Sequence, residues 1–190
     1  SLGIYDSLEY AFYMIPHLET RRIFQSFVAC NFVYFGAPVM FRLFPNHSRS
    51  YWKLSPRDRA DWRSRIVSIT HSIVSFWFSV IPLINEKEMW TDAAYYRSEW
   101  TWIQVEIGIG YFLADTLHVI YFQIPPMLPI LLHHILAGFG LLTCLTSIGR
   151  FGTLVSLIFV TEGANAPRDL VWWLKNVEKL PDSSKRVRVA

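Results

Sequence analysis

Long apolar runs alternate with short polar segments along this chain. Five runs, at residues 23–44, 66–84, 103–122, 127–147 and 153–174, are each close to the about 20 residues with which an α-helix crosses a bilayer. The fifth run is interrupted at residues 161–169 (TEGANAPRD), where glycine and proline weaken a continuous helix. The pattern predicts an all-α integral membrane protein built as a bundle of about five transmembrane helices.

The polar segments divide the chain into three parts. Residues 1–22 mix tyrosines with charges, which is typical of an interfacial N-terminal segment. Residues 47–65 form a basic amphipathic linker, in which Ser55 and Pro56 predict the start of a short helix, and Trp52 and Trp62 are expected at the headgroup level. We expect a transmembrane domain at residues 23–174 and a basic polar tail at residues 175–190.

Composition agrees with a membrane protein and argues against nucleic acid as a partner. Hydrophobic residues make up 52% and charged residues 17% of the chain, whereas soluble domains carry roughly a quarter charged residues. The net charge is only +3, and the basic residues cluster where apolar runs end rather than along one face. With five spans, the basic linker and the basic tail lie on one side of the membrane, and the acidic loop at residues 85–100 lies on the other.

Several polar side chains fall inside the predicted spans, where they are costly unless they pair or line a wet cavity. The candidates for a polar, lipid-binding cavity are His71, Tyr111, Asp115, His118, His133, His134, Glu162 and Asn165. We expect most of them to converge on the bundle interior, because residues three or four apart on a helix share a face, as Tyr111, Asp115 and His118 do.

Each candidate also has a purely structural interpretation, a hydrogen-bond network that fixes helix register. That interpretation is favoured for His71 or His118 alone. The adjacent pair His133–His134 favours a binding site, since the two side chains point about 100° apart on the helix. On the same face as His134, Gly138 is expected to let a neighbouring helix approach closely.

Sequence motifs point to no metal and no cofactor. The histidines lack the HxxxH, HxxHH and HExxH spacings of metal enzymes, and the chain has no GxSxG, P-loop or GxGxxG motif. We therefore expect neither a metal site nor a bound cofactor, and the sequence assigns no catalytic residue.

Four ordered blocks resemble the TLC domain, the family of ceramide synthases, translocation-associated membrane proteins and smaller TLC-domain-containing proteins. The blocks are residues 65–80 (RIVSITHSIVSFWFSV), 110–117 (GYFLADTL), 133–136 (HHIL) and 161–173 (TEGANAPRDLVWW). Their order and spacing, over roughly residues 23–174, resemble the smaller members most. The resemblance implies that His71, Asp115, His133, His134 and Glu162 face the bundle interior. In one respect the chain is expected to depart from the family: it stops soon after the fifth span, where family members normally continue with further spans.

The resemblance implies a protein that binds or handles membrane lipids in an organelle, the endoplasmic reticulum by family. In the ceramide synthases, paired histidines and downstream aspartates are implicated in acyl transfer from acyl-CoA to a sphingoid amine. This chain resembles the synthases but lacks their long acidic motif after the paired histidines. We therefore favour a role without catalysis. Two alternatives stay open: a non-catalytic accessory subunit among other membrane subunits, with the mitochondrial inner membrane as one setting, and an acyltransferase related to ceramide synthases.

Overall fold

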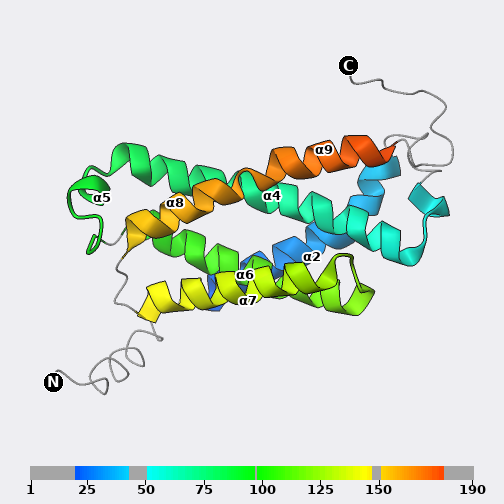
Figure 1. Cartoon of the computed structure of the whole chain (residues 1–190), viewed down its shortest axis with the longest axis horizontal. Coiled ribbons are helices and arrows are strands. Elements are labelled where there is room, and N and C mark those ends of the chain that lie inside the picture. The colour runs from blue at the N-terminus through cyan, green and yellow to red at the C-terminus, as the bar shows by residue number, and fades with distance from the viewer. Residues whose placement is uncertain (1–19, 43–50, 97, 147–150, 178–190) are drawn as a thin grey trace.

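The computed structural model describes residues 20–42, 51–96, 98–146 and 151–177, which form seven helices and no strand (Figure 1). An all-helical fold is thereby confirmed for the described residues. Apart from residues 20–22 and 175–177, the predicted interfacial segment and the predicted basic tail lie outside them. The helices are α2 (Thr20–Arg42), α4 (Pro56–Asn85), α5 (Glu88–Thr91), α6 (Glu99–Phe122), α7 (Met127–Thr146), α8 (Gly152–Glu162) and α9 (Asn165–Val177).

Helix α4 begins where the sequence predicts and continues much further than expected. The Ser55 side chain accepts a hydrogen bond from the Asp58 amide at 3.1 Å, and Pro56 is the first helical residue. The helix then runs for 30 residues to Asn85. The prediction of a separate short helix before the second span is wrong, because residues 57–81 contain no glycine or proline that would stop it.

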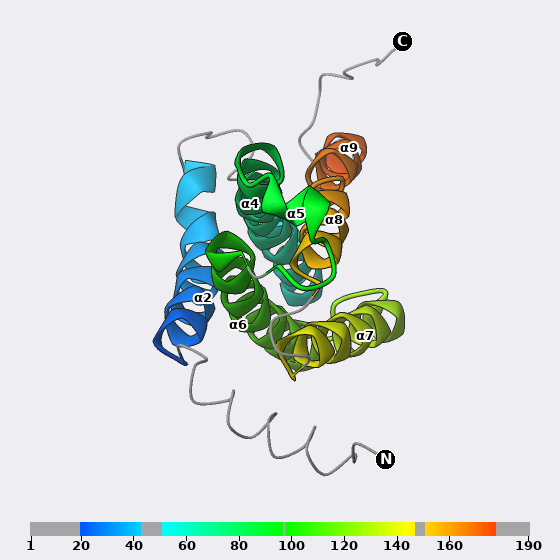
Figure 2. The ribbon, with the colours of Figure 1, turned by 90° about the vertical axis from the view of Figure 1, so that its left-hand side faces the viewer.

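Helices α4 and α6 run side by side in opposite directions through the middle of the bundle (Figure 1). Helix α2 packs along α6 and also contacts α4, whereas α8 and α9 follow the other side of α4, and α7 packs mainly on α6 (Figure 2). The main core lies where these helices meet and includes Tyr34, Val105, Phe112, Val119 and Phe159.

A small aromatic cluster joins α4 to α9 at one end of the bundle. The Trp62 ring lies 5.8 Å from the Trp172 ring and 5.4 Å from the Trp173 ring, centroid to centroid. Trp62 is therefore buried, not free at the headgroup level as the sequence suggested, because the partners that cover it come from a distant segment. Trp52 is 47% exposed and remains available to that layer.

The fifth apolar run breaks where the sequence predicts. Helix α8 ends at Glu162, and α9 begins at Asn165. Between them, Gly163 packs against α4, since a Cβ at this position would lie 2.7 Å from Cδ2 of Phe76. The break carries the residues that reach the cavity described below.

By length and composition, α4 and α6 are the described helices able to cross a membrane. Helix α7 contributes a shorter apolar stretch at Met127–Thr143. Two such helices agree with the membrane character expected from the sequence. They account for two of the about five spans that the sequence predicts.

Candidate functional site

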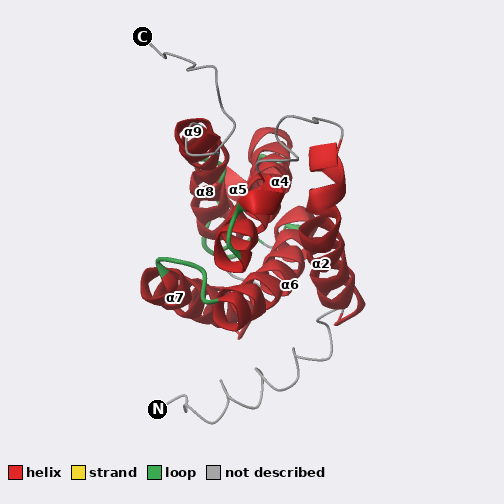
Figure 3. Cartoon of the chain, turned by 90° about the vertical axis from the view of Figure 1, so that its right-hand side faces the viewer, coloured by secondary structure: helices red, strands yellow, loops and turns green. Residues whose placement is uncertain are grey.

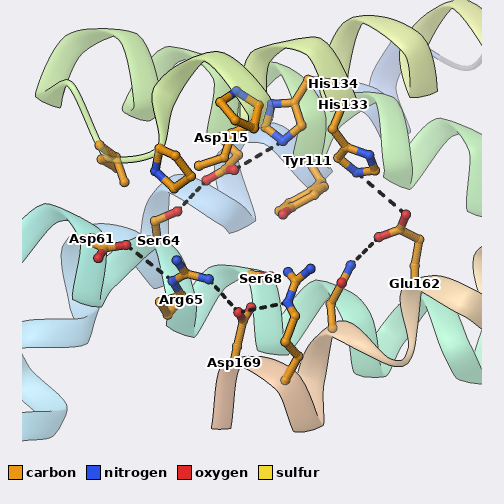
Figure 4. Close-up of a pocket in the computed structure, with 16 residues that line it drawn as sticks. Asp61, Ser64, Arg65, Ser68, Tyr111, Asp115, His133, His134, Glu162 and Asp169 are labelled. Atoms are coloured by element: carbon orange, nitrogen blue, oxygen red, sulfur yellow. Dashed lines mark hydrogen bonds and ion pairs between the residues drawn. The ribbon is translucent and has the colours of Figure 1, made fainter. Parts of the chain in front are cut away.

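A polar cavity of about 340 Å³ lies between α4, α6, α7 and the junction of α8 with α9 (Figure 4). Three segments far apart in the chain bring predicted polar residues to it. Six of the eight side chains singled out in the sequence line this cavity: Tyr111, Asp115, His133, His134, Glu162 and Asn165.

Asp115 and His134 form the most fully bonded part of the cavity. The Ser64 hydroxyl donates to Oδ1 of Asp115 at 2.9 Å, and Nε2 of His134 lies 3.4 Å from Oδ2. The Thr116 hydroxyl lies 2.9 Å from Nδ1 of His134. Each ring nitrogen of His134 and each oxygen of Asp115 thus has a polar partner, and both side chains are buried. Partners on every side hold the two groups in fixed orientations.

His133 faces a different partner and is far more accessible. Its side chain is 50% exposed, and its Nε2 lies 3.7 Å from Oε1 of Glu162. The Asn165 amide donates a hydrogen bond to the other oxygen of Glu162. Because neighbouring residues on a helix point about 100° apart, the two histidines divide the cavity, with His134 turned to Asp115 and His133 turned to the end of α8 (Figure 4).

A second set of charges lines the side of the cavity formed by α4 and α9. Arg65 donates to Oδ1 of Asp169 at 2.7 Å and to Oδ1 of Asp61 at 3.3 Å, and its guanidinium lies 4.7 Å from the Trp172 ring centroid. Arg168 approaches the same oxygen of Asp169 at 3.6 Å. Asp169 is fully buried, so Arg65 is the group that neutralises it inside the protein.

This set of ion pairs was not predicted from the sequence. The four-residue spacing of Asp61 and Arg65 was an available signal for an ion pair on one helix face. Nothing local connects Arg65 with Asp169, which lies 104 positions later and becomes its neighbour only when α9 packs on α4. Seven further lining residues were not singled out as site residues from the sequence: Ser64, Ser68, Ile124, Pro126, Pro129, Ile130 and Arg168.

His71 and His118 lie outside the polar cavity. The His71 ring stacks on Tyr111 at 3.7 Å between centroids, and the ring lines a separate, mostly apolar groove of about 420 Å³ between α2, α4 and α6. The His118 ring stacks on Tyr34 at 3.7 Å, with Nε2 3.1 Å from the Asn31 side-chain oxygen. The predicted stripe on α6 therefore divides, since the helix turns His118 toward α2.

The cavity combines charge with an apolar wall. Its acidic groups are Asp61, Asp115, Glu162 and Asp169, its guanidinium groups are Arg65 and Arg168, and Ile124, Pro126, Pro129 and Ile130 form the apolar part. Among the described residues, no three histidine, cysteine, aspartate or glutamate side chains are placed to hold a metal ion. Chemically, such a lining offers hydrogen bonds and charge to a polar group, and contact to an attached hydrocarbon chain.

The chain is similar to curated TLC domain-containing proteins. Three relatives match: TLC domain-containing protein 2 of Mus musculus, 31% identical over 108 residues, the same protein of Homo sapiens, 29% identical over 110, and TLC domain-containing protein 4 C of Dictyostelium discoideum, 23% identical over 133. These matches cover 56%, 57% and 68% of this chain, but only 34%, 42% and 48% of the relatives. The chain thus spans less than half the length of the curated relatives it matches. No solved structure matches it.

The family profile of the TLC domain matches residues 61–184. The match contains all four blocks on which the resemblance was based and every residue that lines the polar cavity, while α2 precedes it. Since the profile covers more than half of the sequence, the chain belongs to the TLC domain family of membrane proteins.

Proposed function

We propose that this chain binds a membrane lipid and holds the polar headgroup in the cavity beside Asp115 and His133, without chemistry on the lipid. The observation that carries the proposal is the level of the cavity along α4. Its α4 residues, Asp61 to Ser68, stand where the helix changes from a basic segment to the apolar run at residues 66–84. In a bilayer, this change corresponds to the boundary between headgroups and hydrocarbon.

The size and the surroundings of the cavity support the same function. Its volume of about 340 Å³ falls within the range of small-molecule sites, roughly 300–1,000 Å³. Leu136 lies one turn after His133 on α7 and is 70% exposed, so it shares the helix face on which an acyl chain would continue from a bound headgroup. The lipid would then have its polar part among charged groups and its chain along α7.

The residues that follow the paired histidines support a role without catalysis. The ceramide synthases, which this chain resembles, carry a long acidic motif after their paired histidines. At the junction of α8 with α9 this chain has Glu162 and Asn165 instead, and the Asn165 side-chain amide donates a hydrogen bond to Glu162.

The proposal is tested by measuring the lipid that purifies with the chain. The full chain is extracted in mild detergent, and bound lipid per mole of protein is measured by mass spectrometry. We expect a stoichiometric lipid on the unaltered chain and on His118→Gln, whose side chain lies outside the cavity. In Asp115→Asn and in His133→Gln we expect at least a fivefold loss of that lipid. Equal lipid content in all four proteins would contradict the proposal.

An acyltransferase would give a different result in the same preparation. N-acyl product formed from acyl-CoA and a sphingoid base, and abolished by His133→Gln, would replace the proposal with enzymatic acyl transfer.

An accessory subunit is the second candidate function, and it is supported by the open side of α7. A Cβ built on Gly138 or Gly140 would meet no described atom within 4 Å, so the close helix approach expected at Gly138 does not occur within the described part of the chain. Small residues with open space beside them are where membrane helices of a partner can pack. Migration of the chain only within a large complex of fixed protein partners, without stoichiometric lipid, would favour this function.

We further propose that α2, α4, α6, α7 and the consecutive pair α8 and α9 are the five spans. Helix α2 has 23 residues and α7 has 20, which gives lengths of about 34 and 30 Å at a rise of about 1.5 Å per residue, enough for a hydrocarbon core of about 30 Å. An organelle membrane is the proposed location, the endoplasmic reticulum by family and the mitochondrial inner membrane for an accessory subunit.

A further inference from the structure

Exposed positive charge gathers at one end of the bundle. Figure 3 looks onto the end where α2 finishes, α4 begins and α6 turns into α7. We call the side chains of Arg42, Lys53, Arg57 and Arg59 the basic end; all four belong to this end, and Arg59 alone among them is partly covered.

Acidic groups at the basic end offset only part of this charge. Among the described residues there, the carboxylates are Asp58, Asp61 and Asp169. Asp61 and Asp169 both pair with Arg65. Asp58 is exposed and accepts a hydrogen bond from the Ser55 hydroxyl at 2.7 Å, so its charge offsets one of the four basic side chains. The basic end therefore keeps a surplus of positive charge directed outward.

The opposite end of the bundle has no such surplus of positive charge among its described residues. Glu88, Asp92 and Glu99 are exposed there, around α5 and the start of α6. In the described part of the chain, the exposed basic residues on that side are Arg21 and Lys87. The charge thus differs between the two ends, which in a membrane protein face opposite leaflets.

The length of α4 sets the level of the basic end. Its 30 residues extend about 45 Å at a rise of about 1.5 Å per residue, whereas the hydrocarbon core is about 30 Å thick. About 10 residues therefore project beyond the hydrocarbon, which corresponds to the segment before the apolar run at residues 66–84. Arg57 and Arg59 belong to this projecting segment and lie at the depth of lipid headgroups.

Packing separates the four arginines of that segment into two pairs. Arg63 is turned inward, with its guanidinium 4.5 Å from the Tyr34 ring centroid, and Arg65 is held by its carboxylates. Arg59 instead lies over the exposed Trp52, 5.5 Å from the ring centroid. Tryptophan prefers the interfacial layer, so the outward pair, Arg57 and Arg59, has an aromatic anchor beside it.

We propose that the basic end binds the anionic phospholipid headgroups of the leaflet that surrounds it, with Trp52 seated among the glycerol groups. A basic residue near an anionic surface contributes about 1 kcal/mol, which corresponds to about a fivefold change in binding per residue. This surface is separate from the polar cavity, and the proposal does not depend on a ligand bound there.

The test measures which lipids stay with the chain. The full chain is placed in nanodiscs made from equal parts phosphatidylcholine and phosphatidylserine, and the lipids retained on the released protein are counted by native mass spectrometry. We expect phosphatidylserine to be enriched over phosphatidylcholine. In Arg57→Gln/Arg59→Gln the enrichment falls by about fivefold per residue removed, and in Arg57→Lys/Arg59→Lys it is kept.

A matched control removes equal charge from the other end. Arg21→Gln/Lys87→Gln is expected to keep the enrichment of the unaltered chain. Because Arg57 also donates to the Gln123 carbonyl at 2.7 Å, Arg59→Gln alone provides the test if the double variant does not fold. An unchanged lipid ratio in the Arg59→Gln variant, or an equal loss in the control, overturns the proposal. So does the loss of a co-purifying protein with the lipid ratio unchanged, which would assign the basic end to a protein partner.

Discussion

The crossing of α2 with α6 depends on the lack of a side chain at Gly110. A Cβ at this position would clash with the Ile23 carbonyl oxygen and would lie 2.7 Å from Cβ of Ser26 and 2.9 Å from the Phe27 amide nitrogen. Two of these three neighbours are backbone atoms, which cannot rotate away as a flexible side chain can. Replacing Gly110 by alanine must therefore move the two helices apart.

The cost of that movement can be worked out from the contacts. Overpacking by one methyl group costs about 1–3 kcal/mol. Separation also strains the hydrogen bond from the Ser26 hydroxyl to the Ile107 carbonyl, now 2.7 Å, and such bonds are worth about 0.6 kcal/mol in membrane proteins. Alanine recovers up to about 1 kcal/mol of helix propensity, so the raw effect of Gly110→Ala understates the clash.

Gly138→Ala is the matched control, because no described atom lies within 4 Å of its Cβ position. The propensity gain is common to both variants and cancels in their difference. Gly110→Ala should then be less stable than Gly138→Ala by about 1.5–3.5 kcal/mol. Unfolding is followed by circular dichroism as the mole fraction of dodecyl sulfate in mixed micelles rises. Coincident unfolding curves for the two variants would refute the close crossing of α2 with α6.

Two further predictions concern buried polar contacts and use the same unfolding assay. Arg65→Gln leaves the buried Asp169 without its 2.7 Å partner and should lower the free energy of unfolding by about 2–3 kcal/mol, somewhat less than for a fully buried pair because Arg65 keeps some exposure. Arg168, whose side chain is 65% exposed, provides the control, since Arg168→Gln should cost at most about 1 kcal/mol. Equal losses in the two variants would contradict the assignment of Arg65 as the neutralising group. Ser79→Ala removes the hydroxyl that accepts from Gln104 at 2.6 Å and should cost about 1 kcal/mol. Gln104→Leu should cost less than Ser79→Ala, because it also removes a buried side-chain oxygen that has no hydrogen-bond partner among the described residues. The reverse order would show that this amide stabilises the fold more than its contacts indicate.

Much of the local structure could be predicted from residue types alone. Ser55 followed by Pro56 satisfies and pre-organises a helix start, and the structure has one there. Gly163 weakens the fifth apolar run, and α8 stops one residue before it. The four family blocks were also recognisable, because they are defined by residue order. Such features depend on neighbours within a few positions, and the sequence contains those neighbours directly.

Most of the predicted polar residues do line the cavity, but the sequence did not show which side chains pair with each other there. Polar residues inside apolar runs need polar partners or a wet cavity, and this requirement identified Asp115, His133 and His134 as a group. Helical periodicity states which side chains share a face, but it does not state which helix that face meets. His118 shares a face with Asp115 by spacing, yet it stacks on Tyr34 of α2.

Tertiary structure alone decided the contacts between distant segments. The pairing of Arg65 with Asp169 arises because α9 packs on α4, and the burial of Trp62 arises from the same packing. The continuity of α4 was also decided by the whole molecule: a basic segment and an apolar run look like two elements in sequence, but an unbroken backbone hydrogen-bond ladder joins them when no residue interrupts it. Sequence thus determined which residues must be sheltered or exposed, and packing determined by what, because the free energy of a buried charge depends on the partner that the fold brings to it.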